Sequence, residues 1–160
     1  MRHYIGVIAC CLTMVSLTAC HTKAEDTHAH VQLAQGSQPV KGAIEGVEIA
    51  GYCPVAYVEA NKPVLGKQAY PVTYQGKTYW FVDRGAQAAY ENNPERYRIA
   101  YQGWSATELA SGERVTSDPT LFVVHNGVVY LFASTSSRDA FLADSEAIVR
   151  KASEHWDTIK

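Results

Sequence analysis

Two stretches decide the fold: residues 74–81 read Tyr-Gln-Gly-Lys-Thr-Tyr-Trp-Phe, and residues 125–132 read His-Asn-Gly-Val-Val-Tyr-Leu-Phe. In each, aromatic and β-branched residues surround a polar residue followed by glycine, Gly76 or Gly127. Such a pair tolerates the positive φ angles that the tight turn of a β-hairpin requires. Both stretches are therefore predicted to be β-hairpins.

The two stretches align at an offset of 51 residues (127 − 76), and the correspondence continues beyond them. Six pairs of positions agree at this offset: Gly76/Gly127, Tyr79/Tyr130, Phe81/Phe132, Ala89/Ala140, Tyr90/Phe141 and Glu95/Glu146. A repeat of this length with the same turn chemistry predicts a duplicated structural unit.

Each predicted hairpin leads into helical sequence. Candidate N-caps precede two of the helices: Asp83 for a helix over 84–91, and Ser134 or Ser136 for a helix ending at Leu142. A second helix follows in each unit, beginning at Asn93-Pro94-Glu95 in the first and running from Asp144-Ser145-Glu146 to about Trp156 in the second. Each unit thus reads strand-strand-helix-helix.

The predicted fold class is α+β, with two hairpin-plus-helix units over about 51–100 and 103–157. A lone hairpin would expose one apolar face, so the two units are expected to share one core. The chain has 160 residues, 47% of them hydrophobic, which suffices for one domain with a real core. The formal net charge of −2 gives no basic surface of the kind that binds nucleic acid, so no nucleic-acid partner is expected.

The N-terminal stretch predicts an export signal. Residues 5–17 are mostly apolar, too few to cross a bilayer comfortably but typical of the central region of a signal peptide. The run ends in Leu17-Thr18-Ala19-Cys20, which resembles the bacterial lipobox. The resemblance implies that residues 1–19 are removed and that Cys20 carries the lipid. The alternative is an ordinary signal peptide, with Cys20 as a stray thiol.

This resemblance implies a partner and a location. The lipid would hold the protein on a membrane of the bacterial cell envelope. His21, rather than the Asp associated with inner-membrane retention, follows Cys20, so the outer membrane is preferred where two membranes exist. Residues 20–42 are polar and lack a helical or strand period, so they are expected to form a flexible tether before a folded domain over 43–160.

Within the predicted tether, His28 and His30 stand two residues apart. Such a pair could chelate copper or zinc loosely, and the alternative is a solvated linker that happens to contain histidine. Removal of residues 1–19 and acylation of Cys20 would leave Cys53 as the single free thiol. No internal disulfide is then possible.

Residues 51–57, Gly-Tyr-Cys-Pro-Val-Ala-Tyr, resemble the opening of YHS-domain proteins. The likeness continues through 79–81, 93–97 and 101–106, and it spans about residues 44–157. The resemblance implies a small exported protein that handles a metal, often copper, through cysteines. This chain departs from that pattern, because Ser105 stands where many relatives have Cys, and Cys53 stands where relatives often have Asp.

Cys53 therefore has three interpretations. It could bind a soft metal ion such as Cu(I), alone or with a histidine such as His125 or His155. It could be a redox-active thiol if a neighbouring cation or helix N-terminus lowers its pKa. It could also be a small buried apolar side chain. No known catalytic signature surrounds it, so the chain is predicted to be a non-enzyme.

The duplication predicts where a site would form. Gly51-Tyr52-Cys53 and Gly103-Trp104-Ser105 correspond with a slip of one residue relative to the hairpins. We therefore expect Cys53 to lie close to Trp104 and Ser105, in a small aromatic pocket with Tyr52 and Tyr101. The predicted function is a lipid-anchored, non-catalytic envelope protein that binds a metal or another envelope component. The alternatives are a thiol-dependent redox protein and a purely structural lipoprotein.

Overall fold

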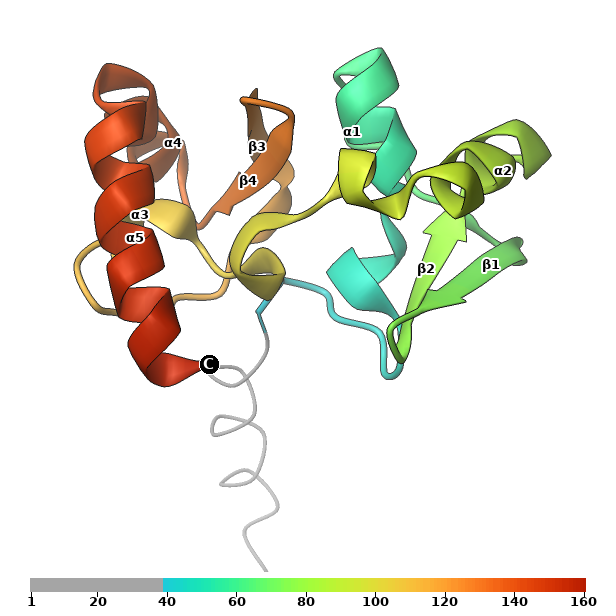
Figure 1. The fold of residues 1–160 in the computed structure, drawn as a ribbon, viewed down its shortest axis with the longest axis horizontal. Coiled ribbons are helices and arrows are strands. Elements are labelled where there is room, and N and C mark those ends of the chain that lie inside the picture. The colour runs from blue at the N-terminus through green and yellow to red at the C-terminus, as the bar shows by residue number, and fades with distance from the viewer. Residues whose placement is uncertain (1–38) are drawn as a thin grey trace, which may run out of the picture.

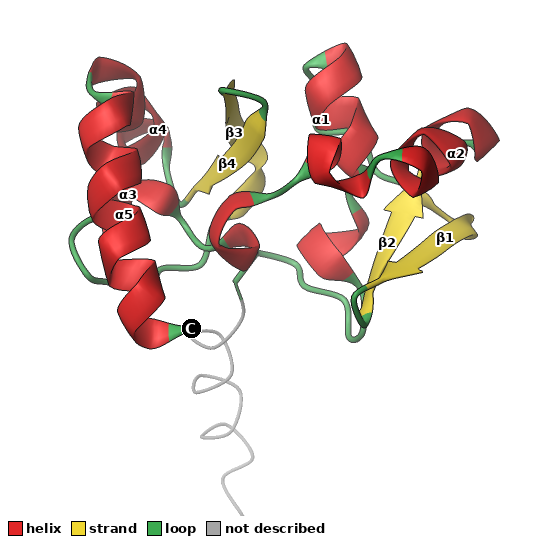
Figure 2. Cartoon of the chain, in the orientation of Figure 1, coloured by secondary structure: helices red, strands yellow, loops and turns green. Residues whose placement is uncertain are grey.

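The computed structural model describes residues 39–160, which form two lobes of similar construction (Figures 1 and 2). The first unit contains a 3₁₀ turn, two strands, two α-helices and a second 3₁₀ turn: η1 (Glu48–Gly51), α1 (Pro54–Ala60), β1 (Lys67–Tyr74), β2 (Lys77–Phe81), α2 (Arg84–Asn92) and η2 (Pro94–Tyr97). The second unit repeats this order: η3 (Ala100–Gly103), α3 (Ala106–Leu109), β3 (Asp118–His125), β4 (Val128–Phe132), α4 (Thr135–Ala143) and α5 (Ser145–Ile159). The predicted α+β class is confirmed.

Both predicted hairpins are present. Strands β1 and β2 pair antiparallel, as do β3 and β4, and Tyr79 and Tyr130 occupy equivalent positions opposite Val72 and Val123. The residues of both turns have positive φ: Gln75, Gly76, Asn126 and Gly127. A register shift follows the first residue of β1 and of β3, so even this irregularity is duplicated.

The helix caps follow the sequence signals. Asp83 accepts a hydrogen bond from the Ala86 amide at 2.9 Å, and Asp144 accepts one from the Ala147 amide at 3.2 Å. Ser134, rather than Ser136, caps α4. The last helix extends three residues beyond Trp156, to Ile159, whereas Pro94–Tyr97 forms only a 3₁₀ turn.

Each unit opens with a segment that the strand-strand-helix-helix prediction missed, a left-handed turn followed by a short α-helix. Ile49, Ala50 and Gly51 have φ angles of 50°, 51° and 78°. Tyr101, Gln102 and Gly103 repeat the turn with φ angles of 50°, 53° and 89°. These turns align at an offset of 52 (103 − 51), one more than the hairpins, so the predicted one-residue slip is confirmed.

The core consists of three clusters rather than one. The first unit buries its own cluster, which includes Cys53, Phe81 and Tyr90. The second unit does the same with Phe132 and Phe141 as its fully buried aromatic residues. A central cluster joins the units: Val40, Ile49, Ala50, Tyr57, Val129 and Leu131. The expected shared core corresponds to this central cluster.

The folded body begins earlier than predicted. Val40 is buried in the central cluster and forms a parallel bridge with Ser117. The Lys41 amide donates to the Ser117 carbonyl at 2.6 Å, and the Ser117 amide donates to the Pro39 carbonyl at 3.0 Å. The prediction that the tether extends to residue 42 is therefore wrong, because Pro39 and Val40 have backbone partners far along the chain that local sequence does not reveal.

Candidate functional site

Cys53 lies inside the first unit, at the start of α1. Its side chain has no exposed area and belongs to the cluster that contains Phe81, Tyr90 and Tyr97. Its amide donates to the Val64 carbonyl at 2.9 Å. The surroundings are those of a small buried side chain, which was the third interpretation of this residue.

The histidines suggested as partners for Cys53, His125 and His155, both have other neighbours in the second unit. His125 lies at the second hairpin turn, 3.2 Å from a Glu146 carboxylate oxygen, and His155 of α5 lies 3.0 Å from the Leu109 carbonyl. Among residues 39–160, no three or more His, Cys, Asp or Glu side chains gather in a way that could hold a metal ion. Cys20, His28 and His30 lie outside the described residues.

Ser105 is the counterpart of Cys53 in the second unit, but its surroundings are polar. Its buried hydroxyl accepts a hydrogen bond from the Ala133 amide at 2.8 Å and donates one to Glu108. The Ser137 hydroxyl donates to the same carboxylate. Ser105 therefore holds α3 against the end of β4, and its hydroxyl has a structural role.

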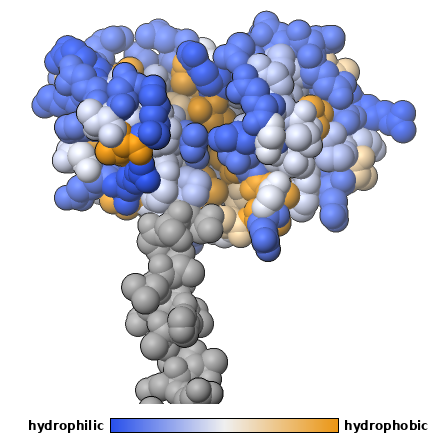
Figure 3. Space-filling view, turned by 60° about the horizontal axis from the view of Figure 1, so that its bottom comes forward, coloured by the Kyte–Doolittle hydropathy of each residue, from blue (hydrophilic) through white to orange (hydrophobic). Residues whose placement is uncertain are grey.

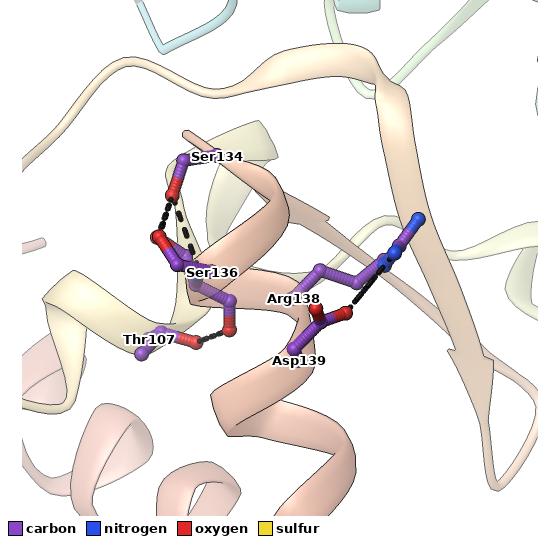
Figure 4. A network of polar contacts seen from close by, with 6 residues as sticks. Thr107, Ser134, Ser136, Arg138 and Asp139 are labelled. Atoms are coloured by element: carbon purple, nitrogen blue, oxygen red, sulfur yellow. Dashed lines mark hydrogen bonds and ion pairs between the residues drawn. The ribbon is translucent and has the colours of Figure 1, made fainter.

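Further polar contacts attach α3 to the first turn of α4 (Figure 4). The Thr107 hydroxyl donates to the Ser137 carbonyl at 2.8 Å. The Ser134 hydroxyl, at the N-cap of α4, lies 2.9 Å from that of Ser136, two residues further along the chain. These contacts serve helix packing, because each hydroxyl already has a partner within the protein.

The predicted common pocket is also wrong. Tyr52 packs beside the central cluster, with its ring 6.5 Å from that of Tyr57. Tyr101 faces α5, where its hydroxyl donates to the Val149 carbonyl at 3.1 Å. Trp104 is buried beside Ser105. The repeat places Cys53 and Ser105 at equivalent positions of the two units, so each residue packs inside its own unit.

The two units do share an aromatic arrangement. In the first, the ring of Tyr90 lies 6.1, 5.3 and 5.0 Å from those of Tyr74, Tyr79 and Phe81. In the second, the ring of Phe141 lies 5.9, 5.0 and 5.1 Å from their counterparts, His125, Tyr130 and Phe132. Near-equal spacing at every pair shows that both units pack one helix onto one hairpin in the same way.

The units differ in what covers this arrangement. In the second, Tyr101 fills the space over Tyr130, with ring centroids 5.9 Å apart, and Trp156 of α5 lies 6.1 Å from Tyr101. In the first, η2 ends after one turn, and Ile49, at the position equivalent to Tyr101, is buried in the central cluster. A surface hollow of about 290 Å³ remains there, lined among others by four tyrosines and two basic residues: Tyr74, Tyr79, Tyr90, Tyr97, Lys77 and Arg98.

The charges of the hollow are unequally compensated. Lys77 lies 3.4 Å from Glu48, and Glu95 accepts a hydrogen bond from the Tyr74 hydroxyl at 3.2 Å. No carboxylate among residues 39–160 forms an ion pair with Arg98. Sequence reasoning missed this hollow, because its lining residues come from the hairpin, α2 and the segment after η2, which only the folded chain brings together.

Burial keeps Tyr79 and Tyr90, which line the hollow, neutral. Loss of solvation raises the pKa of Tyr90 to about 12, and it raises the pKa of Tyr79 further, with the neighbouring Tyr90 adding to the effect. Burial also raises the pKa of Tyr57 and Tyr101. All these groups are therefore uncharged hydrogen-bonding phenols at neutral pH.

These shifts predict alkaline unfolding. An unfolded tyrosine ionises near pH 10, whereas the folded protein holds the protonated form to higher pH. The stabilisation is thus complete below about pH 10 and is lost as the pH rises toward the folded pKa values, about 12 for Tyr90. We expect the tyrosinate absorbance of the buried tyrosines Tyr57, Tyr79 and Tyr90 to appear in the same transition as the loss of tertiary circular dichroism. Ionisation of all the tyrosines at pH 10 in a still-folded chain would contradict this.

No described helix is long and apolar enough to cross a membrane. The face turned forward in Figure 3 is mainly hydrophilic, with small separate hydrophobic patches. Exposed large apolar side chains are few among the described residues: Ile44, Val64, Leu65 and Leu142. Comparison of the chain with protein-family models, curated proteins and solved structures finds no match.

Proposed function

We propose that this chain is a non-catalytic binding protein, resembling YHS-domain proteins, that a lipid on Cys20 attaches to the bacterial cell envelope. The lipobox-like sequence before Cys20 supports the attachment. The observation that carries the binding role is the tyrosine-lined hollow of the first unit. The second unit fills the corresponding space with its own Tyr101 and α5, so the first unit has an opening that its fold does not require.

The hollow favours a ligand other than a metal ion at Cys53. A thiol without exposed area can meet neither a metal donor nor a partner disulfide unless the first unit opens. A metal site at Cys53 and a redox thiol both depend on this residue, so both lose support. The other alternative, a purely structural lipoprotein, gives no reason for the open space over Tyr79 and Tyr90.

Replacing Cys20 by serine should release the protein from membranes into the soluble exported fraction, because a hydroxyl cannot accept the thioether-linked lipid. Fractionation after a salt wash, followed by immunoblotting, measures the shift. The matched control is Cys53→Ser, which removes the one thiol expected to stay free and should remain in the membrane fraction. If the Cys20→Ser protein remains in the washed pellet, lipid attachment at this residue is wrong.

A further inference from the structure

We propose that the hollow over the first hairpin binds a small aromatic carboxylate. This inference rests on the proposed binding function and names the class of ligand. It depends on two independent features of the described residues: the way the second unit fills the equivalent space, and the unpaired cation that lines the hollow.

The second unit shows which kind of side chain can pack over this aromatic arrangement. The ring of Tyr101 lies 5.9 Å from that of Tyr130, and its hydroxyl has two polar neighbours at 3.1 Å, the Val149 carbonyl and the Ser153 hydroxyl. A phenol thus occupies the space over the equivalent hairpin position. In the first unit the equivalent position is Tyr79, which lines the hollow, whereas Ile49, at the position equivalent to Tyr101, is buried in the central cluster. An added aromatic ring restores the packing that the second unit makes internally.

The size of the hollow limits the ligand to about one ring. Its volume of about 290 Å³ lies at the low end of the range for small-molecule sites. The lining supplies tyrosine rings, which favour offset or edge-on contact with another aromatic ring. Pro94 and Ile99 add apolar surface at its border. A polymer or an extended peptide would contact this site with only one of its side chains.

The charged side chains that line the hollow favour an aromatic carboxylate over an uncharged aromatic ligand. Two cations and one carboxylate line the hollow: Lys77, Arg98 and Glu95. Lys77 is paired with Glu48, whereas Arg98 has no ion-pair partner among residues 39–160. A guanidinium presents a planar fork of N–H donors that matches a carboxylate. A ligand carboxylate at Arg98 would therefore compensate this charge while the ring lies over the tyrosines.

The test is calorimetric titration of the full chain carrying Cys20→Ser with 4-hydroxybenzoate, and in parallel with its neutral analogue 4-hydroxybenzyl alcohol. We expect saturable one-to-one binding of the acid, and binding of the alcohol about tenfold weaker or below detection. A factor of ten is what the loss of one charge-assisted hydrogen bond at a partly exposed site produces.

Three variants locate the site. Arg98→Gln should weaken binding of the acid about tenfold without changing binding of the alcohol, because it removes only the charge. Gln102→Trp places a ring in the hollow from an exposed position and should abolish binding of both compounds. Arg150→Gln removes an exposed arginine from α5 and should leave both affinities unchanged.

The outcomes separate the ligand class from the proposed function. Equal affinity for acid and alcohol, both lost in Gln102→Trp, would overturn the carboxylate assignment and leave a binding protein with a neutral aromatic ligand. No saturable binding of either compound would overturn this inference. Acid binding that Arg98→Gln and Gln102→Trp leave unchanged would also overturn it, because the site would lie elsewhere. Lipid attachment is judged by fractionation alone, so its failure is seen separately.

Discussion

Replacing Phe132 by alanine should lower the free energy of unfolding by about 3–5 kcal/mol, a large share of the stability of a domain this size. Phe132 has no exposed area, and its ring lies 5.1 Å from that of Phe141. Truncation leaves a cavity between β4 and α4 that rigid neighbours cannot fill. Phe81→Ala should cost a similar amount, because Phe81 is equally buried and lies 5.0 Å from Tyr90.

Denaturant unfolding of the full chain carrying Cys20→Ser, followed by tryptophan fluorescence, measures both losses. The matched control is Leu142→Ala, because Leu142 is 57% exposed and its removal should change stability by about 0.5 kcal/mol or less. If one phenylalanine proves dispensable while the other does not, the two interiors are not energetically equivalent. If either variant fails to accumulate, Phe→Leu at that position keeps the comparison measurable with a smaller cavity.

The second large effect is expected at Tyr57, which joins the two units. Tyr57 is fully buried, its ring lies 4.8 Å from that of Phe122, and its hydroxyl donates to the Pro119 carbonyl at 2.8 Å. Tyr57→Ala should cost about 3–5 kcal/mol, the range for truncating a buried aromatic residue. Tyr57→Phe should cost about 1–3 kcal/mol, because it leaves a buried carbonyl without this donor.

The difference in stability between the two Tyr57 variants separates the contribution of ring packing from that of the hydrogen bond between the units. Thermal unfolding followed separately by tryptophan fluorescence and far-ultraviolet circular dichroism measures both stability and cooperativity. We expect the two probes to coincide in the native chain and in Tyr57→Phe, and to separate in Tyr57→Ala as the units lose their coupling. Equal stability losses in the two variants would show that packing of the Tyr57 ring contributes nothing to the contact between the units.

Much of the fold follows from local chemistry. The glycine-containing turns fix both hairpins, and the acceptor side chains of Asp83, Ser134 and Asp144 fix where helices begin. The offset between repeats locates Phe81 and Phe132 in the interior. Each of these features acts over a few residues, or repeats at a constant spacing, so a single sequence is enough to detect it.

The parts that sequence reasoning missed depend on contacts between distant residues. A left-handed conformation at Ile49 has no local signal, since β-branched residues rarely adopt it, and only Gly51 hints at the turn. The helix after Cys53 was detectable from Pro54, because proline is favoured in the first turn of a helix. The expected pocket failed because equivalence within a repeat does not imply proximity in space. The hollow went unnoticed because only the folded chain brings together its lining residues from the hairpin, α2 and the segment after η2.

The attachment of residues 39–41 to Ser117 has a mechanical consequence. A pull on the chain at Pro39 is resisted first by the backbone hydrogen bonds between Pro39, Lys41 and Ser117, and by the ion pair between Lys41 and Asp118 at 3.6 Å. All these partners belong to the chain just before or at the start of β3. Tension arriving from the N-terminal side therefore passes along backbone hydrogen bonds into the second unit, and it reaches the first unit only through the packing of Val40 in the central cluster. The first hairpin, with its hollow, carries none of these backbone contacts.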